Sequence, residues 1–206
     1  MKRSNVATYA DVYTDIRSVF GKTGTAKKNG LCARHFSFNS PGGRCENCEG
    51  LGYIDNNMLF FANTEIVCPV CNGSQFRPEV LEVTYKGASI KDVLNLSIEE
   101  AAELFADVPK ILRILNLLMD VGLNYLQLGQ SLTTLSGGEC QRLRLAKELI
   151  QTASNKECLY LMDEPQRAFT PVISGISWRY LTVWLMLAIP SSRRSITSSS
   201  FHIATG

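Results

Sequence analysis

The sequence predicts an α/β fold that is interrupted by a small four-cysteine module. Three observations support this expectation. Four of the cysteines stand in two Cys-x-x-Cys pairs, a Ser-Gly-Gly segment precedes an amphipathic stretch, and a later apolar stretch ends in two acids. The chain has 206 residues, 45% of them hydrophobic, which is enough to bury a core in one or two small domains.

Charge is distributed unevenly along the chain. The formal net charge of +2 does not by itself indicate nucleic acid, but residues 1–48 contain eight basic side chains and three acidic ones. We therefore expect a basic arm at the start. No apolar run follows Met1, and the most apolar stretch, 180–189, is too short to span a bilayer. These features predict a cytoplasmic protein without a membrane partner, whose cysteines stay reduced.

The cysteine pattern predicts one structural zinc ion. Cys45 and Cys48 are separated by nineteen residues from Cys68 and Cys71, and two such pairs are typical of tetrahedral thiolate coordination. Four thiolates leave no position for water, so a catalytic zinc is not expected. The alternative is two disulfides or four buried thiols, which a reducing compartment disfavours.

The residues around the two pairs fit this interpretation. Glycines at 50, 52 and 73 permit the positive backbone angles that metal-binding turns often need. Residues 51–54 and 58–67 can form a two-stranded ribbon between the pairs. Three cysteines without a paired partner are expected to be buried or incidental thiols: Cys32, Cys140 and Cys158.

The middle of the chain predicts one strand and two helices. Residues 81–85 alternate as a half-buried strand, and Lys86-Gly87 closes a turn. Ser97 with Glu100 forms a capping box for a helix that extends to about Ala106. Asp107 and Pro109 open a second helix, whose apolar side chains repeat at helical spacing and are expected in the core: Ile111, Leu112, Leu115, Leu118 and Met119.

The segment Leu135-Ser-Gly-Gly-Glu-Cys-Gln-Arg142 predicts a phosphate-binding helix start. It precedes a helix with apolar residues at 143, 145, 146 and 149, and such a start offers free backbone amides and a positive dipole end. The alternative is that Ser136 is only an N-cap. About twenty residues later, a short apolar strand ends at Asp163 and Glu164. This arrangement resembles the Walker B strand of an ABC-type ATPase, and the alternative is a solvated strand end.

Together these segments resemble the UvrA family, the ATP-dependent damage-recognition subunit of bacterial nucleotide excision repair. The resemblance extends from about Arg3 to Pro165. It rests on Arg-Ser-Asn-x-Ala-Thr-Tyr at residues 3–9 and on segments that begin at residues 36, 42, 81, 119, 128 and 133, among them Gly42-Gly-Arg-Cys-Glu-x-Cys48 and Thr133-Thr-Leu-Ser-Gly-Gly-Glu139.

The resemblance implies an ABC-type ATPase fragment with an inserted signature domain and a four-cysteine zinc module. Residues 1–130 would belong to the inserted, DNA-facing domain, with the zinc module at 45–71. Residues 131–165 would supply the ABC signature helix and the Walker B strand. The family forms a homodimer and works with the other excinuclease subunits.

The resemblance also implies roles for individual residues. ATP held by the other module would meet Ser136, Gly137, Gly138, Glu139 and Gln141. Asp163 would assist magnesium, and Glu164 would polarise the hydrolytic water. Double-stranded DNA would meet basic side chains, which bind phosphate without sequence preference: Lys22, Lys27, Lys28 and Arg34. The alternative for these four is a solvated face.

The sequence departs from the family pattern in two places. It contains no Gly-x4-Gly-Lys-Ser/Thr loop, so we expect a fragment that does not turn over ATP alone. After Pro165 the family's Thr-Thr-Gly-Leu-His and later switch histidine are replaced, and residues 166–206 contain no Asp, Glu or Lys. We interpret 166–206 as an aberrant tail read out of frame, with a divergent extension as the alternative; translating the other frames beyond codon 165 tests this.

Two other functions remain open. One is a non-catalytic, zinc-binding and DNA-binding fragment or pseudogene product. The other is a UvrA-like paralogue that protects against DNA-binding drugs.

Overall fold

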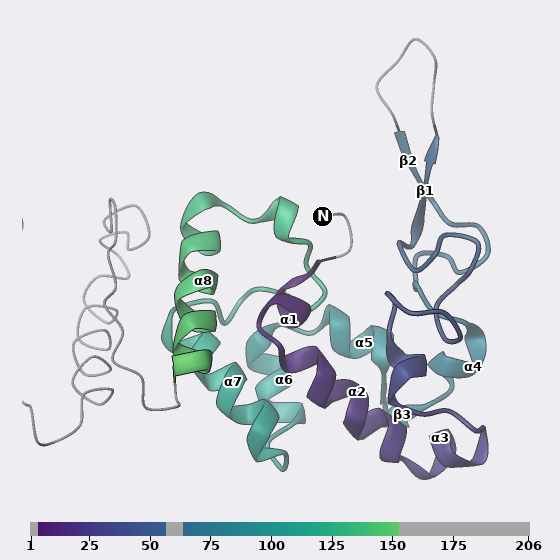
Figure 1. Ribbon diagram of the computed structural model, residues 1–206, viewed down its shortest axis with the longest axis horizontal. Helices are drawn as coiled ribbons and strands as arrows, with labels where there is room; N and C mark the ends of the chain where they lie inside the picture. The colour runs from purple at the N-terminus through teal and green to yellow at the C-terminus, as the bar shows by residue number, and fades with distance from the viewer. Residues whose placement is uncertain (1–3, 57–63, 153–206) are drawn as a thin grey trace, which may run out of the picture.

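The computed structural model describes residues 4–56 and 64–152. The described residues are mainly helical, with two small antiparallel sheets (Figure 1). The first half contains α1 (Val6–Tyr9), α2 (Val12–Lys22), α3 (Gly24–Lys28), the 3-10 helix η1 (Ala33–Phe36), β1 (Tyr53–Asn56) and β2 (Thr64–Val67). The second half contains α4 (Pro78–Leu81), β3 (Thr84–Tyr85), β4 (Ala88–Ser89), α5 (Ile90–Asn95), α6 (Ile98–Leu104), α7 (Pro109–Asp120), the 3-10 helix η2 (Leu132–Thr134) and α8 (Gly137–Thr152).

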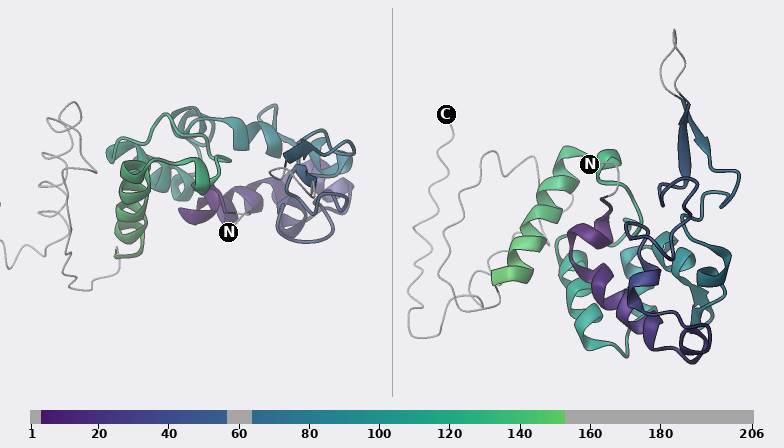
Figure 2. Two further views of the ribbon diagram at one scale, coloured as in Figure 1. Left: turned by 90° about the horizontal axis from the view of Figure 1, so that it is seen from above. Right: turned by 45° about the vertical axis from the view of Figure 1, so that its right-hand side comes forward.

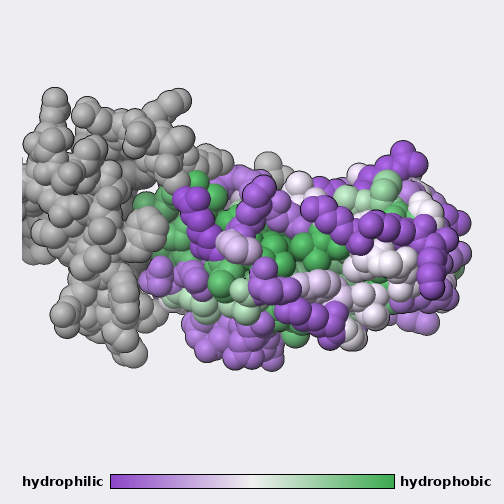
Figure 3. Space-filling model, turned by 90° about the horizontal axis from the view of Figure 1, so that it is seen from below, coloured by the Kyte–Doolittle hydropathy of each residue, from purple (hydrophilic) through white to green (hydrophobic). Residues whose placement is uncertain are grey.

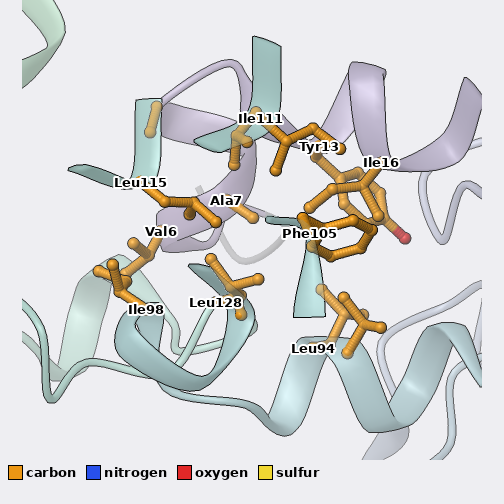
Figure 4. Close-up of a cluster of buried hydrophobic side chains, with 14 of the residues drawn as sticks. Val6, Ala7, Tyr13, Ile16, Leu94, Ile98, Phe105, Ile111, Leu115 and Leu128 are labelled. Carbon is orange, nitrogen blue, oxygen red and sulfur yellow. The ribbon is translucent and has the colours of Figure 1, made fainter. Parts of the chain in front are cut away.

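Helix α2 crosses the middle of the main hydrophobic core. Its residues Val12, Ile16 and Phe20 are fully buried, and α6 and α7 contribute side chains to the same cluster. Figure 4 shows ten labelled members of this cluster, which come from segments as distant in sequence as Val6 and Leu128. The core therefore depends on contacts between the first and last described segments.

The opening segment is not an arm. Asn5 caps α1 through a reciprocal pair of bonds with Thr8. The amides of Val6 and Ala7 donate to the carbonyls of Gln130 and Leu128, at 3.0 and 2.9 Å. Four of the basic residues of this segment, Arg17, Lys22, Lys27 and Lys28, therefore lie on α2 and α3, which contribute buried side chains to the core.

The middle of the chain confirms the two expected helices. Ser97 and Glu100 form the capping box at the start of α6, and α7 begins at Pro109. Of the apolar residues expected in the core, three on α7 are fully buried and two are half-buried: Ile111, Leu115 and Leu118, then Leu112 and Met119.

The strand expected at 81–85 is shorter than predicted. Leu81 ends the short helix α4, and only Thr84–Tyr85 pair, with Ala88–Ser89, across the Lys86-Gly87 turn. Buried Val80 and Val83 lie three residues apart, which is a helical spacing rather than the alternation of a strand.

The cysteine-bearing ribbon stands apart from the helices. Strands β1 and β2 pair antiparallel, with Tyr53 opposite Val67 and Ile54 opposite Ile66, and they extend away from the helical body (Figure 2). Within 4–56 and 64–152, no helix is both long and apolar enough to cross a membrane. The Walker B strand with Asp163 and Glu164, Cys158 and the segment 166–206 lie outside the described residues.

Candidate metal centre and signature helix

The two cysteine pairs lie on two turns of the same design. The residue after the second cysteine and the glycine that follows it both have positive φ: Glu49 at 50° and Gly50 at 80°, Asn72 at 48° and Gly73 at 80°. The Gly50 amide donates to the Cys45 carbonyl at 3.0 Å. The predicted need for glycine at 50, 52 and 73 is confirmed, since all three have φ near +80°.

The four sulfur atoms come together at the base of the ribbon. Cys45 Sγ and Cys68 Sγ are 3.9 Å apart, and Cys48 Sγ and Cys71 Sγ are 3.6 Å apart. All four lie within 4.8 Å of one another. In a regular tetrahedron with metal–sulfur bonds of about 2.3 Å, the sulfurs are about 3.8 Å apart. The cluster therefore fits a tetrahedral metal ion, and none of the four forms a disulfide.

Hydrogen-bond donors surround the sulfurs as they would surround bound thiolates. Asn47 Nδ2 donates to Cys68 Sγ at 3.2 Å, and the Gly52 amide donates to Cys48 Sγ at 3.3 Å. Burial opposes ionisation of Cys68, but the Asn47 amide and nearby backbone amides outweigh it and lower its pKa to about 6. Burial raises the pKa of Cys71 to about 12. The surroundings of Cys68 thus favour its thiolate form, and a divalent metal would supply the positive charge that stabilises the other three thiolates.

The first cysteine turn is held tightly against the helical body. A Cβ added to Gly50 would lie 1.9 Å from the carbonyl oxygen of Phe38. Phe38 and Phe76 belong to the main core and lie edge to face, with ring centroids 6.4 Å apart. The Cys45 amide donates to the Gln75 carbonyl at 2.9 Å. The first cysteine turn therefore contacts chain segments on both sides of the cysteine module: Phe38, which precedes the first cysteine pair, and Gln75, which follows the second.

The start of α8 is a closed capping box. Ser136 Oγ accepts from the Glu139 amide at 3.3 Å, and Glu139 Oε2 accepts from the Ser136 amide at 2.7 Å. Ser136 therefore acts as an N-cap. Among the described residues, no acceptor lies on the amides of Gly137 and Gly138. Gln141 is exposed on the first turn.

A tyrosine and an arginine support this capping box. The Tyr125 hydroxyl donates to Glu139 Oε1 at 2.6 Å, and Arg142 Nη2 donates to the Tyr125 oxygen at 3.2 Å. The Tyr125 hydroxyl and the Ser136 amide hold the pKa of Glu139 below its usual value. Both carboxylate oxygens of Glu139 are thus engaged within the protein. Sequence reasoning missed Tyr125, because only the fold brings the loop after α7 to the start of α8.

The four basic candidates lie together around α3. Lys22 ends α2, Lys27 and Lys28 end α3, and Arg34 lies on η1, and all four side chains are exposed. None of them forms an ion pair within the described part of the chain. The underside of the molecule is largely hydrophilic at this end (Figure 3). The fold therefore brings these four residues to one end of the described structure.

Two of the remaining cysteines lie among the described residues. Cys32 and Cys140 are free and exposed, so of the two expected alternatives, a buried or an incidental thiol, the buried one does not apply. The Cys32 sulfur lies 3.4 Å from His35 Nδ1, which also accepts from the Cys32 amide at 2.9 Å.

Comparisons with known proteins show which proteins this chain resembles in sequence and fold. No protein-family model matches the chain. Over 163 residues the chain is 50% identical to UvrABC system protein A of Staphylococcus aureus and 51% identical to that of Bacillus subtilis. Over this segment the chain belongs to the UvrA family. Its structure also matches a crystal structure of UvrA2 from Deinococcus radiodurans, with a TM-score of 0.82 and 42% identity over 91% of the chain.

The chain spans a small part of the UvrA proteins that it matches. The aligned 163 residues are 79% of the chain but 17% of either UvrABC system protein A. The structural match covers 23% of the UvrA2 chain. The similarity therefore identifies a UvrA segment, and the activity of a whole UvrA is a separate question.

Proposed function

We propose that the chain is a zinc-stabilised, DNA-contacting segment of a UvrA-type ATPase that recognises damaged DNA in nucleotide excision repair. The observation that carries the proposal is the cluster of four sulfurs at tetrahedral spacing, in a chain about 50% identical to UvrABC system protein A. The cluster marks a metal-stabilised module inside a segment of this family.

The metal in this proposal is zinc with a structural role. Cys45, Cys48, Cys68 and Cys71 would complete its coordination shell, which leaves no position for substrate or water. Within the described part of the module, the separate cysteine cluster holds no other buried apolar side chain, so these residues form little hydrophobic core of their own. The ion would supply the stability that this core cannot.

The DNA contacts in this proposal come from the helical end and not from the zinc module. Lys22, Lys27, Lys28 and Arg34 offer four exposed cations without ion-pair partners among the described residues. Residues 45–76 contain no Lys or Arg at all. Phosphate contacts would therefore form around α3, with affinity that does not depend on base sequence.

The nucleotide contacts in this proposal involve the start of α8. ATP held by another ATPase module would meet Ser136 and the open amides of Gly137 and Gly138, with Gln141 at the edge. Glu139 would act by holding the helix start, because its oxygens are already bonded. Asp163 and Glu164 would serve magnesium and the hydrolytic water, as the family resemblance implies.

The proposed setting is the cytoplasm, where thiolate ligands stay reduced. Partnership with double-stranded DNA, with a second copy in a homodimer and with the other excinuclease subunits is likewise part of the proposal, by analogy with the UvrABC system proteins that the chain matches.

Binding to a duplex tests the DNA contacts. We expect Lys27→Ala/Lys28→Ala to weaken binding and to reduce the slope of log affinity against log salt by about 0.9 for each phosphate that the variant no longer neutralises. Lys110→Ala/Arg113→Ala, which removes two exposed cations from α7, is the matched control and should leave both unchanged. Equal effects of the two changes would show that binding follows net charge and not this surface. Tighter binding to damaged than to undamaged duplex would then favour a repair subunit over a paralogue.

A further inference from the structure

Exposed apolar side chains gather on the zinc module. Five large hydrophobic residues are exposed among the described residues, and four of them belong to the ribbon or its second cysteine turn. Their exposed fractions are 38% for Ile54, 50% for Ile66, 62% for Val67 and 66% for Val70. Apolar surface gathered on one small projecting element is typical of an interaction site.

The same module is uniformly acidic. Residues 45–76 contain four acids and no Lys or Arg. Glu46 is paired with Arg44, outside this segment. The Glu65 side chain on β2 is exposed and forms no ion pair within 4–56 and 64–152. A cation supplied by a partner can therefore pair with this carboxylate.

One exposed apolar residue and one exposed acid share a face of the ribbon. Because successive residues of a strand alternate between faces, Glu65 and Val67 lie on one face of β2, and the register partners Ile54 and Ile66 lie on the other. Val67 and Glu65 are two residues apart, or about 6.8 Å along the strand. We call this the acidic ribbon face. On this face, apolar Val67 and acidic Glu65 are separated by the distance that also separates residues i and i+2 of an extended peptide.

The chemistry of the acidic ribbon face excludes several occupants. Nucleic acid and anionic lipid would both be repelled by a ribbon that carries acids and no cation. A second copy meeting the same face symmetrically would bring acids against acids. The occupant that complements this face is a polypeptide segment with an apolar side chain and a basic side chain two residues apart.

We propose that the acidic ribbon face binds an extended segment of a partner protein, with an apolar residue against Val67 and a Lys or Arg against Glu65. The ribbon projects from the helical body (Figure 1), so the segment can lie along it without contacting the helices. Apolar burial supplies affinity, and the exposed Glu65 carboxylate selects for positive charge. The site is distinct from the basic residues around α3, and it does not depend on DNA binding there.

A peptide titration followed by amide NMR on the zinc-loaded chain tests this proposal. The probe is Gly-Ile-Ser-Arg-Ser-Ile-Gly, and the same peptide with Glu in place of Arg is the control probe. We expect the Arg peptide to shift amides of Glu65 and Val67, and to bind at least tenfold more tightly than the Glu peptide. A short duplex DNA should shift amides around Lys27 and not those of the ribbon.

Two substitutions separate the charge from the apolar contact. Glu65→Lys should weaken the Arg peptide at least tenfold and strengthen the Glu peptide, and Val67→Thr should weaken both. Glu79→Lys, an exposed acid on α4, makes the same charge change elsewhere and should alter neither. Equal affinity for the two peptides, no effect of Glu65→Lys, or ribbon shifts caused by DNA would each overturn the proposal. Retained zinc in every variant shows that the module is intact.

Discussion

Replacing Gly50 or Gly73 with alanine tests how the first cysteine turn is held. The two glycines occupy equivalent positions, two residues after the second cysteine of each pair, and both have φ of 80°. They differ in their surroundings. A Cβ on Gly50 would lie 1.9 Å from the Phe38 carbonyl oxygen, whereas a Cβ on Gly73 would meet nothing closer than Val67 Cγ1 at 3.7 Å.

The expected magnitudes follow from this difference. A left-handed backbone costs an L-residue about 1–2 kcal/mol, and both variants carry this cost. At Gly50 the separation must also open from 1.9 Å to at least 3.0 Å, which pulls the turn from Phe38 and strains the bond from the Cys45 amide to Gln75. A buried bond left unmade costs about 1–3 kcal/mol. Zinc affinity should fall roughly tenfold for Gly73→Ala and about 100- to 1,000-fold for Gly50→Ala.

Competition for zinc with a chromophoric chelator measures both variants on one scale. Gly24→Ala is the control, because nothing lies within 4 Å of its added Cβ at the start of α3, and it should leave zinc affinity unchanged. If Gly50→Ala and Gly73→Ala weakened zinc equally, contact with Phe38 would not constrain the turn, and the argument from close approach would be wrong.

Three further changes have expected outcomes. Tyr125→Phe removes the donor that lowers the pKa of Glu139, so carboxyl NMR should show this pKa rising. A carboxyl with a lowered folded pKa contributes stability above its unfolded pKa, and this contribution is lost as pH falls through the folded value, so the variant should also lose less stability in acid. Ser97→Ala removes the α6 cap and should cost about 1 kcal/mol in urea unfolding. Lowering the pH should release zinc, since protons compete for the thiolates, and metal retained after dialysis at successive pH values measures this.

Local signals predicted the cluster of four sulfurs and several helix boundaries. The cysteine spacing indicated two short turns, and the four sulfurs lie within 4.8 Å of one another. Ser97 with Glu100 predicted the start of α6 because a capping box is complete within one turn. Features that depend on distant contacts were not predictable. The charge of the opening segment suggested an arm, yet Ile16 is fully buried because α2 lies between segments far along the chain.

The start of α8 illustrates the same distinction at a candidate site. The order Ser-Gly-Gly-Glu predicts a helix start, and α8 begins there. The engagement of Glu139 by Tyr125 depends on how the loop after α7 returns to α8, which no local pattern encodes. The alternation at 81–85 likewise pointed to a strand, while burial of Val80 and Val83 favours a helical turn.

Zinc content per chain tests the central claim most directly. Elemental analysis of the reduced, folded protein should give one zinc ion per chain, and Cys48→Ser should abolish tight binding while Cys140→Ser, which changes an exposed cysteine outside the cluster, should not. A stoichiometry near zero in a reduced and folded sample would contradict the assignment of Cys45, Cys48, Cys68 and Cys71 as a zinc centre.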